Sequence, residues 1–331
     1  MGWWNDLFRK RAQDWVYAQL DGPQVPDEPK EKEEVPVDGA YLTITLRSLR
    51  VVNVRRLATK FYGVVHSFAT LNHLSGKDAS FHTVTSPAEL RNIDPANLDR
   101  VITVKKTLLG PIPYRGEGVG LELGLFSIKE ADLAAPFIDL LESASSAAGV
   151  SVVSTALPFI EPLRKGIDAI TGASGDSILE IGISDTYNPP RTGWWVVMRA
   201  RKGTVDVSKL RVTPTDFRLV DADGQPVRDY PYVVFSISQS GRRDDWFKLP
   251  DLTRPYQELR EAARKGDYEA VKELIATFKR TALTSDDLIT ADAMRIGQLV
   301  QEQAEAVLGR TMTARSAERD LPPLESYPLY A

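Results

Sequence analysis

The chain contains no cysteine among its 331 residues. Disulfides, thiolate metal sites and cysteine nucleophiles are therefore excluded, and a reducing compartment is the natural expectation. Histidine is also scarce: the three histidines are His66, His73 and His82. Their spacing matches none of the compact spacings of metal ligands, and we predict neither a metal site nor a cofactor.

Long apolar runs and an excess of one charge are missing as well. No run of about 18 uncharged apolar residues is present, so the sequence predicts no membrane-spanning helix. The formal net charge is -4 and the pI about 5.6, a balance that argues against nucleic acid as a partner. Trp3, Trp4 and Asp6 precede any basic cluster, the wrong order for a secretory signal. We expect a cytoplasmic protein, with peripheral membrane attachment as the alternative.

Recognisable catalytic motifs are missing too. Gly172-Ala173-Ser174-Gly175 has neither the spacing of a nucleophile elbow nor the Gly-Lys-Ser/Thr of a phosphate loop. Gly116, Gly118 and Gly120 lead into a predicted strand, whereas a dinucleotide fingerprint opens a helix. We therefore expect a protein that is not an enzyme. An unrecognised hydrolase that uses only carboxylates is the least favoured alternative.

Alternating apolar residues are what the sequence does contain. The alternation predicts strands near Leu42–Leu46, Tyr62–Phe68, Val101–Val104, Val119–Leu125, Ile178–Ile183, Trp194–Ala200, Phe217–Val220 and Tyr232–Ile237. Turn residues separate these runs, and Asp221 to Gly224 has the composition of a hairpin turn. Residues 39–249 are thus predicted to form a mainly antiparallel β-sandwich, C2-like or Ig-like in general architecture, within an α+β chain.

Helical spacing interrupts this strand pattern between residues 129 and 172. Leu133, Phe137, Leu140 and Leu141 share one helical stripe, and a second apolar stripe runs from Val150 to Ile170. Strands are predicted on both sides, so these residues are interpreted as a two-helix insertion within the sandwich. The segment 147–170 either seals the core or forms an exposed element that could insert into a membrane.

Acidic residues gather at predicted loop ends, namely Asp185, Asp221, Asp223, Asp244 and Asp245. Calcium-dependent sandwich domains use loop carboxylates of this kind. The calcium-loop pattern of an EF-hand is absent, and turns of this composition are common without any ion. We interpret these residues as turn residues and keep calcium binding as an alternative.

Residues 250–314 are predicted to be helical. Lys265-Gly266-Asp267 separates two short amphipathic helices, and a third helix is expected from Asp292 to Leu308. The run from Leu259 to Ile275 resembles the helical part of an ankyrin repeat. The Thr-Pro-Leu-His turn of that repeat does not recur, so we interpret the run as an αα-hairpin and carry over no function. Residues 315–331 contain Pro322, Pro323 and Pro328 and are predicted to be an extended tail.

The N-terminus is predicted to be a docking element. Residues 1–20 have the spacing of an amphipathic helix, and residues 21–38 have the acidic, proline-rich composition of a linker. A tryptophan-rich basic helix on a tether is typical of a segment that docks onto a partner or a membrane surface. The predicted binding residues are Trp3, Trp4, Leu7, Phe8, Arg11 and Trp15, together with Trp195 at a strand edge.

These features favour a non-enzymatic protein that mediates protein interaction or assembly, as an adaptor or scaffold. Docking through the N-terminal helix is the expected mode, with one or more proteins as partners. The alternative is a protein that binds or inserts into membranes, including a pore-forming protein of a bacterial conflict system. The sequence leaves the partner, the biological process and the oligomeric state open.

Overall fold

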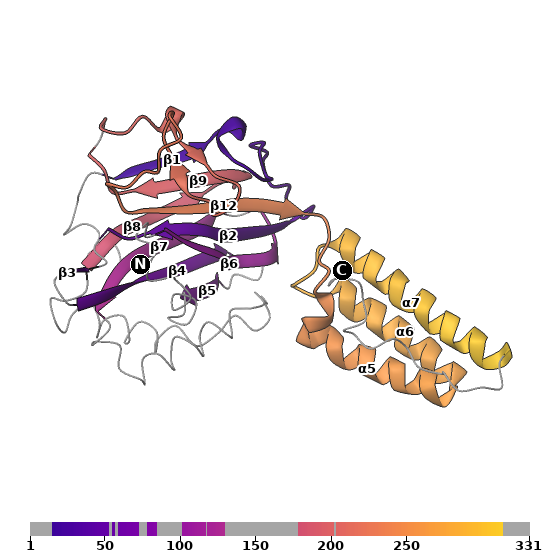
Figure 1. Cartoon of the computed structure of the whole chain (residues 1–331). Helices are drawn as coiled ribbons and strands as arrows, with labels where there is room; N and C mark the ends of the chain where they lie inside the picture. Colours follow the sequence, from indigo (N-terminus) through magenta and orange to yellow (C-terminus); the bar gives the residue numbers. More distant parts are fainter. Residues whose placement is uncertain are drawn as a thin grey trace.

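A computed structural model describes residues 15–52, 55–56, 59–72, 78–84, 101–116, 118–129, 178–201 and 203–313. Over these residues the chain forms antiparallel β-sheets and three α-helices, so the protein belongs to the α+β class. The sheets lie on one side of the molecule and the helices on the other (Figure 1).

The first sheet has five strands in the order β1 (Val16–Leu20), β9 (Gly193–Met198), β12 (Tyr232–Ser240), β2 (Tyr41–Arg50) and β6 (Val101–Pro113). All its neighbouring strands are antiparallel. Leu42, Ile44 and Leu46 are fully buried, while the alternate residues Thr45 and Arg47 are only half-buried. The period-two pattern of β2 therefore separates a core face from an outer face.

The second sheet contains β3 (Arg55–Arg56), β4 (Thr59–Asn72), β7 (Val119–Lys129) and β8 (Ile178–Tyr187), and β5 (Asp78–Val84) pairs with β4. Apolar residues of both sheets belong to one buried cluster, which includes Ile44 and Val197 from the first sheet and Val65, Leu121 and Ile181 from the second. The two sheets thus share one core.

The N-terminal part of the described chain corrects one prediction. Residues 16–20 were expected to be helical, but they form β1, which pairs with β9 from Val16↔Met198 to Leu20↔Trp194. The stretch from Val16 to Leu20 alternates in a way that suits an edge strand, and strand pairing outweighs its weak helical spacing. Residues 1–14 lie outside the described residues.

The predicted linker at residues 21–38 also packs onto the body. It contains a short 3-10 helix, η1 (Gly22–Gln24), and Val25 and Val35 are buried in two different apolar clusters. The backbone N of Val35 donates to the carbonyl of Pro190 over 3.0 Å. The acidic residues face outward, as Glu34 shows by its ion pair with Arg191. The acidic residues of this segment lie on its exposed side, whereas Val25 and Val35 are buried. The prediction of a free linker was therefore wrong.

The predicted insertion at 129–172 lies outside the described residues, except for Lys129, which ends β7. Its flanking strands β7 and β8 are neighbours in the second sheet, with Ser127 opposite Ile178. The intervening chain therefore leaves and re-enters the sheet at adjacent strand ends. The tail predicted at 315–331 also lies outside the described residues.

A small apolar cap covers part of the outer face of the first sheet. It includes η4 (Val207–Lys209), β10 (Arg211–Val212) and β11 (Leu219–Val220). Phe217 and Leu219 of the cap belong to one buried cluster with Trp194 and Val196 of β9. The strand predicted at 217–220 is shorter than expected, because Phe217 has a φ of 53° and cannot extend β11.

After η5 (Trp246–Lys248) the chain forms α5 (Pro250–Lys265), α6 (Tyr268–Leu283) and α7 (Thr290–Thr313). Gly266 ends α5 with a φ of 73°, and the side chain of Asp267 accepts a hydrogen bond from Ala270 N to cap α6. Apolar residues of all three helices form one core, including Leu259, Phe278 and Ile296. We call α5, α6 and α7 the helical arm and the sheets with their cap the body; in the arm, α6 lies between α5 and α7 (Figure 1).

Candidate docking surface on the helical arm

A buried polar junction fixes the helical arm to the body. The carboxylate of Asp292, in the first turn of α7, accepts hydrogen bonds from the Tyr41 hydroxyl over 2.9 Å and from Arg243 N over 2.8 Å. The Tyr41 oxygen in turn accepts from Ile289 N over 3.1 Å. Tyr41 and Arg243 are both 0% exposed and Asp292 is 1% exposed. Residues of β2, of the chain after β12 and of α7 therefore meet in one network.

The electrostatics of the junction favour a neutral Tyr41. Burial is the main cause that raises the pKa of the Tyr41 hydroxyl well above its usual value, and the charge of Asp292 adds to the increase. A protonated hydroxyl is the donor that the Asp292 carboxylate needs. Tyr41 therefore remains a hydrogen-bond donor at physiological pH.

Two arginines extend the junction. Arg243 donates through Nε to Asp245 over 2.8 Å, and Arg115, in the loop after β6, donates to the carbonyl of Leu288 over 2.9 Å. Arg115 also forms an ion pair of 2.7 Å with Asp38. Arg115 crosses from the body to the arm, whereas Arg243 and Asp245 both lie in the chain between β12 and η5. A hydrogen bond that crosses resists rotation better than an apolar contact does, because it has a preferred direction. Together with the Asp292 network, the Arg115 bond favours one orientation of the arm.

The surface of α6 and α7 carries a groove of about 350 Å³, with an apolar lining and charged rims. Val271, Ile275 and Ala276 of α6 and Leu308 of α7 supply its apolar lining, and Tyr268 stands at its end with 62% of its surface exposed. Residues three and four apart on α6 face the same side, so this lining is one continuous stripe of the helix. Val271 is buried at the bottom of this stripe, Ile275 and Leu308 are half-buried, and Ala276 and Tyr268 are exposed. A partly exposed apolar stripe beside a second helix is the form of surface that binds an amphipathic helix.

The rims of this α6/α7 groove carry opposite charges. Lys272 and Lys279 lie on the α6 side, and Glu305 lies on the α7 side. Gln301 lies between the rims: it accepts from Lys279 Nζ and donates to Glu305 over 2.6 Å. A segment bound in the groove would therefore meet positive charge along its α6 edge and negative charge along its α7 edge.

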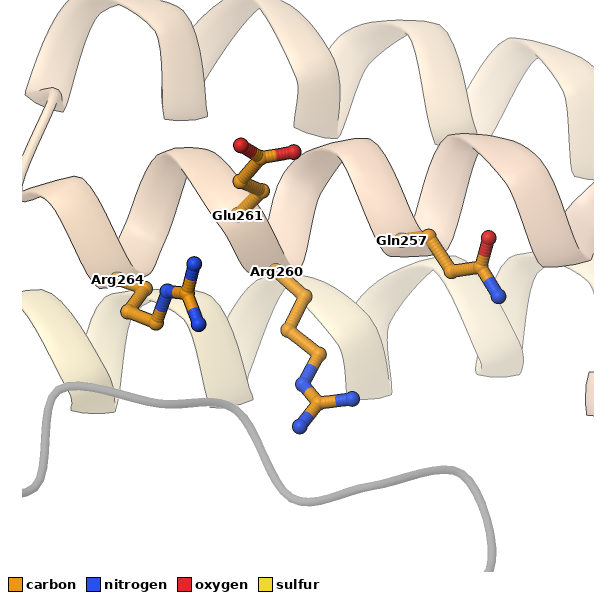
Figure 2. A pocket seen from close by; sticks show the side chains of 4 residues that line it. All are labelled: Gln257, Arg260, Glu261 and Arg264. Atoms are coloured by element: carbon orange, nitrogen blue, oxygen red, sulfur yellow. The ribbon is translucent and has the colours of Figure 1, made fainter.

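A second hollow, of about 290 Å³, lies on α5 and is lined by Gln257, Arg260, Glu261 and Arg264 (Figure 2). Its side chains are long and polar, and the Glu261 carboxylate points away from the guanidinium of Arg260. Glu261 instead pairs with Lys265 over 2.8 Å, and the hydrogen bond from Lys265 lowers its pKa. This shallow polar surface lacks the apolar floor of the α6/α7 groove.

The tryptophans predicted to bind a partner lie elsewhere. Trp195 is only 6% exposed and stacks on Phe235, with ring centroids 5.7 Å apart. The interpretation of Trp195 as an exposed binding residue was therefore wrong, because its side of β9 faces the shared core. Trp15 is half-buried and packs against the same core. The predicted binding residues Trp3, Trp4, Leu7, Phe8 and Arg11 lie outside the described residues.

Of the acidic loop residues, Asp221 acts within its own turn, Asp245 accepts from Arg243, and Asp244 lies 4.0 Å from Arg295 of α7. One carboxylate oxygen of Asp221 accepts from the backbone N atoms of Asp223 and Gln225, over 3.0 and 2.8 Å. His66 and His82 lie on the paired strands β4 and β5. Within the part of the chain that the structure describes, no three His, Asp or Glu residues are grouped to hold a metal ion. Among the described helices, none combines the length and the apolar character that crossing a membrane requires.

No family model, no curated protein and no solved structure matches the chain. The roles of the α6/α7 groove and of the junction at the start of α7 are therefore inferred from their own residues.

Proposed function

We propose that this protein is a non-enzymatic adaptor that mediates protein interaction or assembly. Its body serves as a β-sandwich scaffold, C2-like or Ig-like in general architecture, and its helical arm presents the α6/α7 groove to a partner. The observation that carries this proposal is the apolar groove on an arm whose orientation is fixed by the buried Tyr41–Asp292–Arg243 network. A fixed groove binds without a further entropic cost of orienting the arm.

The occupant we propose for the groove is an amphipathic helix of a partner protein. Its apolar stripe would cover Ile275, Ala276 and Leu308, and helices of a bundle extend naturally by packing one more helix into such a groove. Charge complementarity sets its orientation. Acidic residues are expected on the edge that meets Lys272 and Lys279, and basic residues on the edge that meets Glu305.

The N-terminal residues are a second docking element of the same proposal. Trp15 and β1 anchor the chain at the edge of the first sheet, so residues 1–14 start from a fixed point on the body. The tryptophans and basic residues of that segment suit a groove or surface on a partner. The adaptor would then contact its assembly at two places, one on the body and one on the arm.

Two matched variants test the α6/α7 groove. Ile275→Glu places a charge in the apolar lining, whereas Thr277→Glu places the same charge on an exposed position of α6. A protein that co-purifies with the wild type is to be identified, purified and titrated against both variants. We expect Ile275→Glu to weaken binding at least about tenfold and Thr277→Glu to leave it within about twofold.

Several outcomes would change the proposal. Equal affinity of the partner for both variants would rule out the groove as its docking site. Self-association that Ile275→Glu abolishes, seen by sedimentation, would assign the groove to a second copy of the chain. Tighter partner binding after removal of residues 314–331 would make the chain's own C-terminal residues a competitor for the groove. Flotation with anionic vesicles that is lost after deletion of residues 1–14 would favour the membrane alternative for that segment.

A further inference from the structure

An arginine of the body is held in an aromatic clamp away from the helical arm. The Cζ atom of Arg47, on the outer face of β2, lies 4.7 Å from the ring centroid of Trp194 and 5.7 Å from that of Phe217. The two rings are themselves 5.6 Å apart and inclined by 46°. Arg47 Nε donates to the Ser236 hydroxyl over 2.9 Å. Three contacts therefore fix the guanidinium, which still has four other N–H donors.

A second cation joins this cluster. Lys105 Nζ lies 5.1 Å from the ring centroid of Phe217. Among the described residues, neither Arg47 nor Lys105 has a carboxylate within ion-pairing distance. Burial lowers the pKa of Arg47, and the charge of Asp27 opposes this only in part. Partial burial makes the charged form of Arg47 less favourable, and a bound anion would offset that free-energy cost.

The backbone is strained at the same place. The described chain has three non-glycine residues with positive φ, and two of them are Lys105, with φ 45°, and Phe217, with φ 53°. Lys105 lies where the pairing of β2 with β6 shifts register, between Leu46↔Lys106 and Ser48↔Thr103. Such irregularities re-aim a side chain, and strained residues gather at ligand-binding sites. The two strained residues are the ones that bring an ammonium and an aromatic ring into contact at this site.

Unused donors and hydroxyls complete the surroundings. Trp194 is fully buried, and its Nε1–H has no acceptor in the described part of the structure. On the outer face of the same strands, half-buried Thr45 lies opposite Ser236, whose buried hydroxyl already accepts from Arg47. Arg with Lys and hydroxyl groups is the donor set that proteins use for tetrahedral oxyanions, because a guanidinium binds two oxygens and an ammonium adds charge.

We propose that Arg47 and Lys105 form a binding site for the phosphate group of a ligand on the outer face of the first sheet. The aromatic clamp pre-orients the guanidinium, so little side-chain entropy is lost when the phosphate binds. The phosphate group belongs either to a soluble metabolite or to a lipid headgroup, since both offer the same oxyanion. This site is independent of the α6/α7 groove.

The test titrates the full-length protein with inorganic phosphate and pyrophosphate at constant ionic strength, using calorimetry and thermal melting. We expect saturable binding and a raised melting temperature for the wild type. Arg47→Gln should weaken binding about tenfold or more, and Arg47→Lys should restore only part of the affinity because lysine lacks the fork of donors. Lys105→Gln, at an exposed position, tests the site while leaving the contacts of Arg47 with Trp194 and Phe217 in place.

Arg211→Gln is the matched control, because it removes one positive charge from an exposed position of the cap. Flotation with phosphatidic acid vesicles, compared with phosphatidylcholine vesicles, separates the two sources of phosphate. Binding only to the phosphatidic acid vesicles, lost in Arg47→Gln, assigns a headgroup, and binding of pyrophosphate without flotation assigns a soluble ligand. The proposal is overturned if neither the phosphate titrations nor the vesicle flotation shows binding. It is also overturned if Arg47→Gln and Lys105→Gln weaken binding no more than Arg211→Gln.

Discussion

Replacing Asp292 by alanine would open the buried junction between the arm and the body. The carboxylate accepts from Tyr41, from Arg243 N and from Arg295 Nε, over 2.9, 2.8 and 2.6 Å. The first two donors are buried and would lose their acceptor, at about 1–3 kcal/mol each. The positive charge of Arg295 would also lose its partner. We therefore expect the free energy of unfolding to fall by about 3–5 kcal/mol, a large share of a typical 5–15 kcal/mol.

Urea unfolding followed by circular dichroism measures this loss, and Asp286→Ala is the matched control because Asp286 is exposed in the connection that leads into α7. Tyr41→Phe and the double variant complete a thermodynamic cycle, in which a coupling of about 0.5–3 kcal/mol is expected for residues in direct contact. An Asp292→Ala protein as stable as Asp286→Ala would refute the view that this network fixes the arm. So would additive effects of the Tyr41 and Asp292 variants.

Three further predictions concern the body. Deleting residues 1–14 should change the urea midpoint little, whereas deleting residues 1–20 removes β1 with buried Leu20 and should cost at least about 3 kcal/mol. Trp195→Ala should lower the free energy of unfolding by about 3–5 kcal/mol in the same assay; a loss below 1 kcal/mol would mean that Trp195 is exposed after all. Burial raises the pKa of Tyr232 to about 12, so the folded protein keeps a proton that the unfolded chain releases near pH 10. Its contribution to stability is therefore complete below pH 10 and falls by about 1.4 kcal/mol per pH unit from pH 10 to 12, and Tyr232→Phe should show a shallower alkaline loss in pH-dependent melting.

The strands were predictable where one face of the sheet is buried. Leu42, Ile44 and Leu46 alternate with half-buried residues, and period two is visible in any such strand. The helices of the arm were predictable for a similar reason, since Gly266 and Asp267 mark the ends of α5 and α6 in the sequence itself. Local signals of this kind need no knowledge of distant residues.

Residues 16–38 could not be predicted in this way. The strand β1 exists because β9, which is remote in sequence, offers it an edge, and the burial of Val35 depends on contacts with the chain near Pro190. Proline and acidic residues indicate that a segment avoids regular structure, but they do not show whether a few valines bind it to a core. From the sequence alone, a segment without regular secondary structure that packs on the core is therefore hard to tell from one that does not.

The docking surface proposed on the arm was missed for a related reason. Tryptophan was taken as the sign of an exposed contact, whereas Trp194, Trp195 and Trp246 are all buried. The residues that line the α6/α7 groove are ordinary helix residues, and the sequence analysis marked none of them for binding. The only sequence signal was that the apolar positions of α6 cover more of its circumference than one buried face needs.

The fixed orientation of the arm also sets a distance. The stretch of α7 from Asp292, at the junction, to Leu308, in the groove, is about 24 Å long at 1.5 Å per residue. A partner helix held in the groove would therefore be kept at a constant spacing from anything bound on the sheets. The length of α7 would therefore set this spacing, and inserting matching whole turns into α6 and α7 would change the spacing while keeping the register of the two helices that line the groove.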